Sequence, residues 1–250
     1  MQRQAKRSAD EPRLSATVLV VKDDPFEVLM VKRSPTGSFP SKQVFPGGVV
    51  EPSDWSESWR DHCEGGATLA DKDVALRVAA FRECWEEAGI LCARGIVDLD
   101  EHWPKRTPVP ELLNRLGITI DLDSPADFAH WITPPTSSRR WSTRFLIMRA
   151  PENQRLCCDG EETLSAEWIS PTKAIELAER GERDIVFSTI ANLHLLAQSN
   201  CVDEAIAAAR SRPVISVIPS AERKNGRIFV SIPEEAGFPV SQGWIDEVRL

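Results

Sequence analysis

The chain has 250 residues, 42% of them hydrophobic and 27% charged, and its 38 acidic and 30 basic residues give a formal net charge of −8. These are ordinary values for a globular protein, and they exclude whole-chain disorder. No stretch approaches the roughly 20 apolar residues of a membrane-spanning helix, so we expect no transmembrane protein. The acidic balance argues against general nucleic-acid binding, which requires a basic surface, so we expect neither a nucleic acid nor a membrane as partner.

Apolar periodicity and turn residues predict a mixed succession of strands and helices. The polar residues 1–12 are expected to form a disordered tail, and the polar residues 52–70 an inserted loop. The strongest helix is expected over residues 71–88, with Asp71 as its N-cap and Gly89 at its end. Strands are expected at 14–22, 26–33, 44–50, 90–99, 128–133, 141–149, 165–170, 214–218 and 227–232, and further helices at 111–116, 171–180, 185–198 and 202–210.

The order of these elements, with strands on both sides of one strong helix, predicts an α+β fold arranged as an α/β/α sandwich. We expect one main domain over residues 13–183, with an insertion at about 55–70. Residues 184–250 are expected to form a C-terminal extension of helices and strands packed on the same domain. The charged N-terminus MQRQAKRSAD is not followed by an apolar segment, so we expect a cytoplasmic protein.

The helix at 71–88 has an apolar face and an acidic face when successive residues are placed about 100° apart. On the acidic face Glu83, Glu86 and Glu87 lie three and four residues apart, where like charges repel. A hard divalent cation such as Mg²⁺ or Mn²⁺ would relieve this repulsion, whereas without one the three glutamates would form a solvated acidic face. The apolar face carries Val74, Val78, Phe81, Trp85 and Ala88.

Two segments around this helix resemble the signature of the Nudix hydrolases. Phe45-Pro46-Gly47-Gly48 precedes the helix, and residues 82–90 match the second half of the Nudix box, R-E-U-x-E-E-x-G-U with U apolar. The resemblance implies the Nudix fold with a mixed β-sheet and a Mg²⁺ or Mn²⁺ cofactor. It also implies hydrolysis of a nucleoside diphosphate linked to another group, a small nucleotide-type substrate.

The first half of the box departs from the family pattern. The family places a glutamate where this chain has Asp54, and 27 residues separate Asp54 from Arg82 where the family has seven. A box split in this way resembles the RP2-like subgroup of the Nudix hydrolases, which includes coenzyme A diphosphatases of mammalian peroxisomes. The subgroup implies coenzyme A or acyl-CoA as substrate, with 3′,5′-ADP and (acyl-)4′-phosphopantetheine as products. The similarity extends to the segments LMVKRSP, SSRRWSTRF and SAEWISP.

The resemblance also implies roles for individual residues of the box. Glu86 and Glu87 correspond to the principal metal ligands, with the Gly47 carbonyl as a further ligand. Glu83 corresponds to a metal ligand or to the carboxylate that takes the proton of the attacking water. Arg82 is expected to orient a carboxylate through a charge-assisted bond, and its alternative role is a surface pair with Glu86.

Members of the family often draw a further acid from a loop before a late strand, where this chain has Glu161 and Glu162. Either could be the general base, and an exposed loop acid is the alternative for both. Asp54 and Glu51 are weaker candidates as ligands, because aspartate has a shorter reach than the glutamate of the box and Glu51 lies outside the pattern.

Four arginines are candidates for binding the phosphates of the substrate. Arg33 ends the second expected strand, and Arg139, Arg140 and Arg144 form a basic cluster in an acidic protein. Arginine suits bidentate phosphate contacts, but basic clusters also occur on solvated turns.

The sequence leaves several functions open. A diphosphatase for ADP-ribose, NADH or dinucleoside polyphosphates would need the same box, because the box handles only the pyrophosphate. A Nudix module that binds ligand without turnover is a further alternative, although the presence of all three helix glutamates favours catalysis. A homodimer is also left open.

Overall fold

The computed structural model describes residues 11–36, 39–94, 107–158 and 160–245, so residues 1–10 of the expected tail lie outside it. Its main feature is a mixed eight-stranded sheet with the order β10-β7-β8-β1-β2-β3, in which β4 also pairs with β1 and β9 with β2. The strands are β1 (Arg13–Lys22), β2 (Glu27–Arg33), β3 (Gln43–Val44), β4 (Gly47–Val49), β7 (Ala126–Ile132), β8 (Trp141–Arg149), β9 (Thr163–Ile169) and β10 (Ser216–Val217).

Both pairing directions occur in this sheet. β1 and β2 form an antiparallel hairpin around Asp23-Asp24-Pro25, as expected. β1 also runs parallel to β8 from Arg13–Trp141 to Val21–Arg149, and this long-range pairing makes β1 a central strand. Three further strands form a separate antiparallel sheet, namely β11 (Ser220–Lys224), β12 (Arg227–Ser231) and β13 (Gln242–Ile245).

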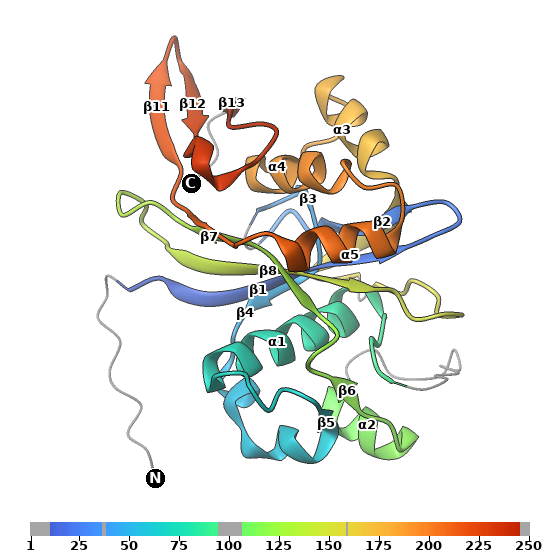
Figure 1. Ribbon diagram of the computed structural model, residues 1–250. Helices are drawn as coiled ribbons and strands as arrows, with labels where there is room; N and C mark the ends of the chain where they lie inside the picture. The colour runs from blue at the N-terminus through green and yellow to red at the C-terminus, as the bar shows by residue number, and fades with distance from the viewer. Residues whose placement is uncertain (1–10, 37–38, 95–106, 159, 246–250) are drawn as a thin grey trace.

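Helices cover the sheet on both faces, as Figure 1 shows, so the expected α/β/α arrangement is confirmed. One core cluster lies between the sheet and α1, and a second lies between the sheet and the helices on its other face. Among the described residues, no helix is long and apolar enough to span a bilayer. The helices are α1 (Asp71–Ala88), α2 (Val109–Leu116), α3 (Pro171–Glu179), α4 (Phe187–Leu196) and α5 (Val202–Ser211).

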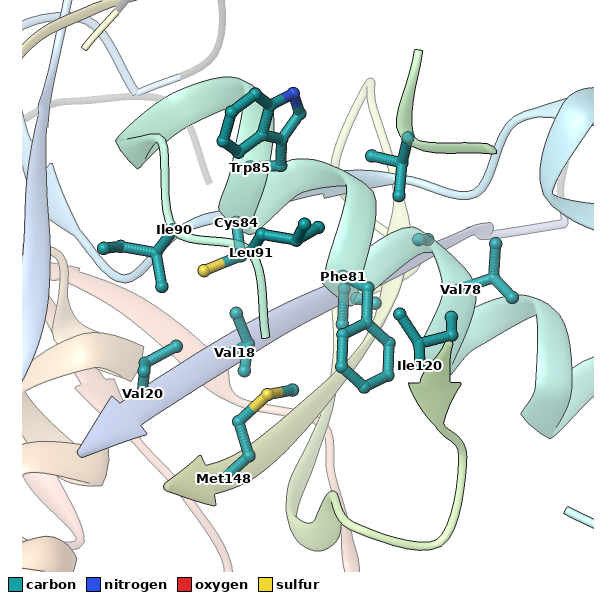
Figure 2. Packing of buried hydrophobic residues seen from close by; sticks show 14 of the residues in the cluster. Val18, Val20, Val78, Phe81, Cys84, Trp85, Ile90, Leu91, Ile120 and Met148 are labelled. Carbon is teal, nitrogen blue, oxygen red and sulfur yellow. The ribbon is translucent and has the colours of Figure 1, made fainter. Parts of the chain in front are cut away.

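Helix α1 packs its apolar face on the sheet as the sequence predicts. Phe81 and Cys84 lie over Val18, Val20 and Met148 of the sheet, all of them nearly inaccessible to solvent (Figure 2). The helix ends at Gly89, whose φ of 68° is a left-handed conformation that glycine adopts without strain. The predicted N-cap was wrong, because Ala70 occupies that position and Asp71 is the first helical residue.

The strand expected at 90–99 is absent over its described part, residues 90–94. Ile90 and Leu91 are buried against α1, and this burial gives them the apolar pattern of a strand. The backbone of Leu91 is satisfied by a side chain instead of a neighbouring strand: its N–H donates to Gln154 Oε1 at 2.7 Å, and its carbonyl accepts from Gln154 Nε2 at 2.9 Å. Residues 95–99 lie outside the described part of the chain.

The segment expected as an inserted loop is more ordered than its composition suggests. It contains two 3₁₀ helices, Pro52–Trp55 and Glu57–His62, followed by β5 (Cys63–Glu64), which pairs with β6 (Ile120–Asp121). Trp59 is buried, and its indole N–H donates to the Ser53 carbonyl at 3.1 Å. The insertion therefore contributes to the core on the α1 side of the sheet.

Replacing Trp85 by alanine should destabilise the fold, because Trp85 is buried and its indole N–H donates to the Thr107 carbonyl. We expect the Trp85→Ala variant to lose about 3–5 kcal/mol of unfolding free energy in a urea titration. Trp55→Ala is the matched control, since Trp55 is largely exposed and should change stability by less than about 0.5 kcal/mol. Equal losses in the two variants would contradict this account of α1 packing.

Candidate active site

The two glycines of the FPGG segment lie where β4 passes between β1 and α1. A side chain at Gly47 would clash with the Ala16 carbonyl of β1, and one at Gly48 would clash with the Glu83 carboxylate of α1. Only glycine therefore fits this passage, and the close approach brings the β4 backbone against the acidic face of the helix.

Arg82 is the centre of the hydrogen-bond network at this point. Its guanidinium forms a bidentate pair with Asp54, with both N–O distances at 3.0 Å. It also donates to the Val49 carbonyl at 3.1 Å, and a single nitrogen, Nη1, contacts Glu83 and Glu86, each at 2.9 Å. All five donors of the guanidinium are used. Arg82 is therefore a buried residue that binds several partners, and its pair with Glu86 is not an isolated surface pair.

Asp54 ties the inserted segment to α1. Its side chain is buried, pairs with Arg82 and accepts the Glu51 backbone N–H at 2.8 Å. The surrounding carboxylates raise the pKa of Arg82 well above its usual range, although burial alone would lower it. The residue at the glutamate position of the box thus holds the arginine of the box, across the 27 intervening residues.

Two of the three helix glutamates are buried, and the third is partly exposed. Burial raises the pKa of Glu83 to about 7 and that of Glu87 to about 8, while the guanidiniums of Arg82 and Arg33 act in the opposite direction. Glu87 is held by the Arg33 guanidinium and by the Gly47 N–H at 3.0 Å. The pKa of Glu86 is also raised, mainly by burial. Glu83 and Glu87 are therefore enclosed and not solvated, whereas Glu86 remains accessible to solvent.

Two of these glutamates border a large cleft of about 1740 Å³. Glu83 and Glu86 line the cleft together with Gly47 and Gly48, whereas Glu87 lies behind them. The cleft is thus a concave surface with acidic groups at one end, as expected of a ligand site. Other side chains that line it are Arg33, Arg139, Arg140, Glu162, Trp131, Trp141, Phe187 and Trp244.

Comparison with known proteins shows which family has this fold and this site. Residues 11–188 match the family described as the NUDIX domain, which is more than half of the chain. The protein belongs to the Nudix family. A crystal structure of a NUDIX hydrolase from Alicyclobacillus acidocaldarius is similar, with 28% identity and a TM-score of 0.67 over 82% of this chain and 100% of that one.

Two curated Nudix relatives carry a more specific name. Acyl-coenzyme A diphosphatase NUDT19 of Gallus gallus is 28% identical over 213 residues, which cover 60% of this chain and 56% of the relative. The protein of the same name from Homo sapiens is 25% identical over 206 residues, with coverage of 60% and 55%. The chain therefore spans little more than half the length of these relatives.

The donor chemistry of this Nudix site fits a hard divalent cation. Glu83 and Glu86 already converge on one cationic nitrogen of Arg82, and carboxylate oxygens are the ligands that Mg²⁺ and Mn²⁺ prefer. Glu87 lies beside them and is neutralised by Arg33 instead. Among the residues that the structure describes, no three acidic, histidine or cysteine side chains are gathered in a metal-binding arrangement, because the arginines hold these carboxylates.

The structure separates the remaining residues that the sequence singled out. Glu162 lines the cleft and is near enough to Glu87 to raise its pKa, whereas Glu161 is exposed and does not line the cleft. Arg33, Arg139 and Arg140 line the cleft. Arg144 does not: it lies on the α1 face of the sheet, where it contacts Asp127 at 3.5 Å. Arg139 and Arg140 lie in the connection that precedes β8, whereas Arg144 lies within β8 on the side that faces α1, so the three arginines of the SSRRWSTR segment do not form one cluster.

Sequence reasoning missed one partner of the box arginine and two residues of the cleft. The role of Asp54 as partner of Arg82 was not predicted, although both positions lie within the box pattern. Arg227 and Trp244 come from the C-terminal sheet and line the same cleft, with the guanidinium 5.5 Å from the indole centroid. No local pattern connects these two residues to the box, because only the tertiary fold brings them there.

Replacing Asp54 by asparagine should leave the buried Arg82 without its bidentate carboxylate. We expect Asp54→Asn to lower the unfolding free energy by about 3–5 kcal/mol, the usual loss when one partner of a buried ion pair is removed. Asp61→Asn is the matched control, because Asp61 is exposed in the same insertion and should change stability by less than about 0.5 kcal/mol. A urea titration measures the unfolding free energy of both variants. Equal stabilities would show that the Asp54–Arg82 pair does not anchor the insertion.

Proposed function

We propose that this protein is a metal-dependent diphosphatase that hydrolyses the pyrophosphate of a nucleoside-diphosphate-linked molecule, with coenzyme A or acyl-CoA as the first candidate. The observation that carries the proposal is the convergence of Glu83 and Glu86 on one cationic centre at the wall of a cleft that also carries Arg33, Arg139 and Arg140. Carboxylates that can hold a cation next to arginines are what a pyrophosphate requires.

In the proposed reaction a water oxygen attacks one phosphorus, and the bond from that phosphorus to the bridging oxygen breaks. The bridging oxygen leaves with the electron pair on the other phosphate, and the water proton passes to a carboxylate. Glu83 and Glu86 would hold Mg²⁺ or Mn²⁺, and Glu87 would join them as a ligand in place of its pair with Arg33. The ion would neutralise the pyrophosphate and lower the pKa of bound water. Arg82 fixes the orientation of Glu83 and Glu86, and Glu162 is our candidate for the carboxylate that takes the proton.

Two observations support coenzyme A over smaller substrates. The curated relatives named acyl-coenzyme A diphosphatase share 25–28% identity with this chain. The cleft of about 1740 Å³ also exceeds the roughly 300–1,000 Å³ of most small-molecule pockets, so it can accept a long substrate. Arg139 and Arg140, at the end of the cleft formed by the β7–β8 connection, are our candidates for binding the phosphate that coenzyme A carries on its ribose.

Analysis of the reaction products tests which substrate the protein hydrolyses. Purified protein is incubated with Mg²⁺ or Mn²⁺ and, separately, coenzyme A, an acyl-CoA, ADP-ribose, NADH and a diadenosine polyphosphate. We expect release of 3′,5′-ADP from the two coenzyme A species and no turnover after chelation of the metal. Cleavage of another substrate alone would retain the diphosphatase and reject coenzyme A. No cleavage of any substrate, with metal binding verified, would favour a Nudix module that binds without turnover.

The Glu86→Gln variant tests the catalytic end of the cleft. We expect kcat to fall by at least about 100-fold, because the amide is a poor ligand for a hard cation, while the melting temperature stays unchanged since Glu86 is partly exposed. Glu111→Gln is the matched control: Glu111 on α2 also pairs with an arginine four residues away and lies outside the cleft. A Glu86→Gln variant as active as Glu111→Gln would refute the assignment.

Glu161 and Glu162 provide a second matched pair. If Glu162 takes the proton of water, Glu162→Gln should lower kcat by about 10²–10⁴-fold and flatten the acidic limb of the pH–rate profile. Glu161→Gln should leave both the rate and the profile unchanged, because Glu161 does not line the cleft. Steady-state kinetics over a range of pH compares the two variants, and an unaltered profile in Glu162→Gln would assign the proton transfer elsewhere.

A further inference from the structure

A second hollow, of about 400 Å³, lies at the β7 edge of the sheet. Three elements contribute to it: α1 from one face of the sheet, the start of β7, and the end of α5 from the other face (Figure 1). None of its lining residues lines the cleft of the proposed active site. Its charged lining residues are Arg77, Asp127, Arg210 and Arg212.

The lining of this hollow is strongly basic in a protein whose net charge is −8. Three arginines face a single carboxylate, that of Asp127, which leaves two positive charges uncompensated. Asp127 is moreover shared with Arg144, which contacts it at 3.5 Å, while its contact with Arg77 is 3.7 Å long. The aspartate therefore does not fully neutralise either of its two partners.

Arg77 is buried without adequate hydrogen bonds. It is 6% exposed, and among the described residues its Nε has no hydrogen-bond partner. Within the described ranges, its guanidinium makes only a 3.5 Å contact with the Asp73 carbonyl besides the 3.7 Å contact with Asp127. Arg82 on the same helix, by contrast, uses all five donors at 2.9–3.1 Å. Since unsatisfied buried donors of a charged group are costly, Arg77 has the character of a binding group without its ligand.

The other basic residues reinforce this positive site. Arg212 lies over the Phe128 ring at 4.4 Å and donates to the Phe128 carbonyl at 2.6 Å, and burial lowers its pKa. Arg210 is exposed and forms no ion pair within the described part of the chain.

We propose that this hollow is a second anion site, which binds a phosphate group of a small molecule and is separate from the substrate cleft. A phosphate dianion matches the two uncompensated charges of the lining, and guanidinium groups bind phosphate through paired N–H donors. The volume of about 400 Å³ suffices for a small phosphorylated molecule. Bound there, a phosphate would connect α1 to α5 around the sheet edge and would supply acceptors for Arg77.

Titration with inorganic phosphate tests the site on the full-length protein, without divalent metal and at constant ionic strength. The readout is the amide shift of Ala126 and Ala209 in ¹H–¹⁵N NMR spectra, because these residues line the hollow and not the cleft. We expect a saturable shift that is at least about tenfold weaker in Arg77→Gln and in Arg210→Gln, the usual loss for one charge-assisted contact. Arg180→Gln, an exposed charge at the end of α3, should bind phosphate as the wild type does.

Three results would overturn the proposal. One is the absence of a saturable shift up to about 50 mM phosphate, well above the Kd of a weak specific site. Another is an equal shift with acetate, which would indicate general charge screening. The third is unchanged binding in Arg210→Gln, a variant at an exposed position that keeps the fold intact. A mutation in the cleft, Arg139→Gln, should leave these shifts unaffected, so failure here is distinct from failure of the proposed activity.

Discussion

The buried pair of Arg82 and Asp54 is the interaction on which the rest of the site depends. It joins α1 to the beginning of the insertion, and the same guanidinium positions Glu83 and Glu86 and binds the β4 backbone at Val49. Because each donor is occupied, a shift of any partner would leave a charged donor unsatisfied. One side chain thus fixes the relative positions of a helix, a strand and an inserted segment.

The second constraint is the burial of acidic groups in a low-dielectric setting. Glu83 and Glu87 have raised pKa values because they are desolvated, and each is balanced by one arginine, Arg82 or Arg33. The two arginines come from different elements, α1 and β2, so each carboxylate has a hydrogen-bonded guanidinium of its own. Like-charge repulsion on the helix is therefore relieved by cations of the protein itself.

The sequence predicted those features that local periodicity and a contiguous motif determine. Helix α1, the hairpin of β1 and β2, and the acidic positions on α1 follow from residue spacing within short windows. The prediction of a strand at 90–99 was wrong over residues 90–94. Leu91 is buried and its backbone hydrogen bonds go to the Gln154 side chain, but its apolar surroundings in the sequence look like those of a strand. The separation of Arg144 in β8 from Arg139 and Arg140 in the cleft, and the placement of Trp244 in the same cleft, depend on long-range pairing, which no local window contains.

The ion pair between Asp54 and Arg82 affects how much the length of the segment between them can vary. Extending the connection between Asp54 and Arg82 from 7 to 27 residues adds only about 1 kcal/mol of closure entropy in polymer theory, less than the roughly 3–5 kcal/mol lost when one partner of a buried ion pair is removed. As long as both ends are held by that pair, the length of the exposed part of the segment is under weak thermodynamic constraint, whereas buried Trp59 and the pairing of β5 with β6 hold the rest in place. The segment between the two halves of the motif is therefore a place where new sequence can be accepted while the acidic face of α1 keeps its shape.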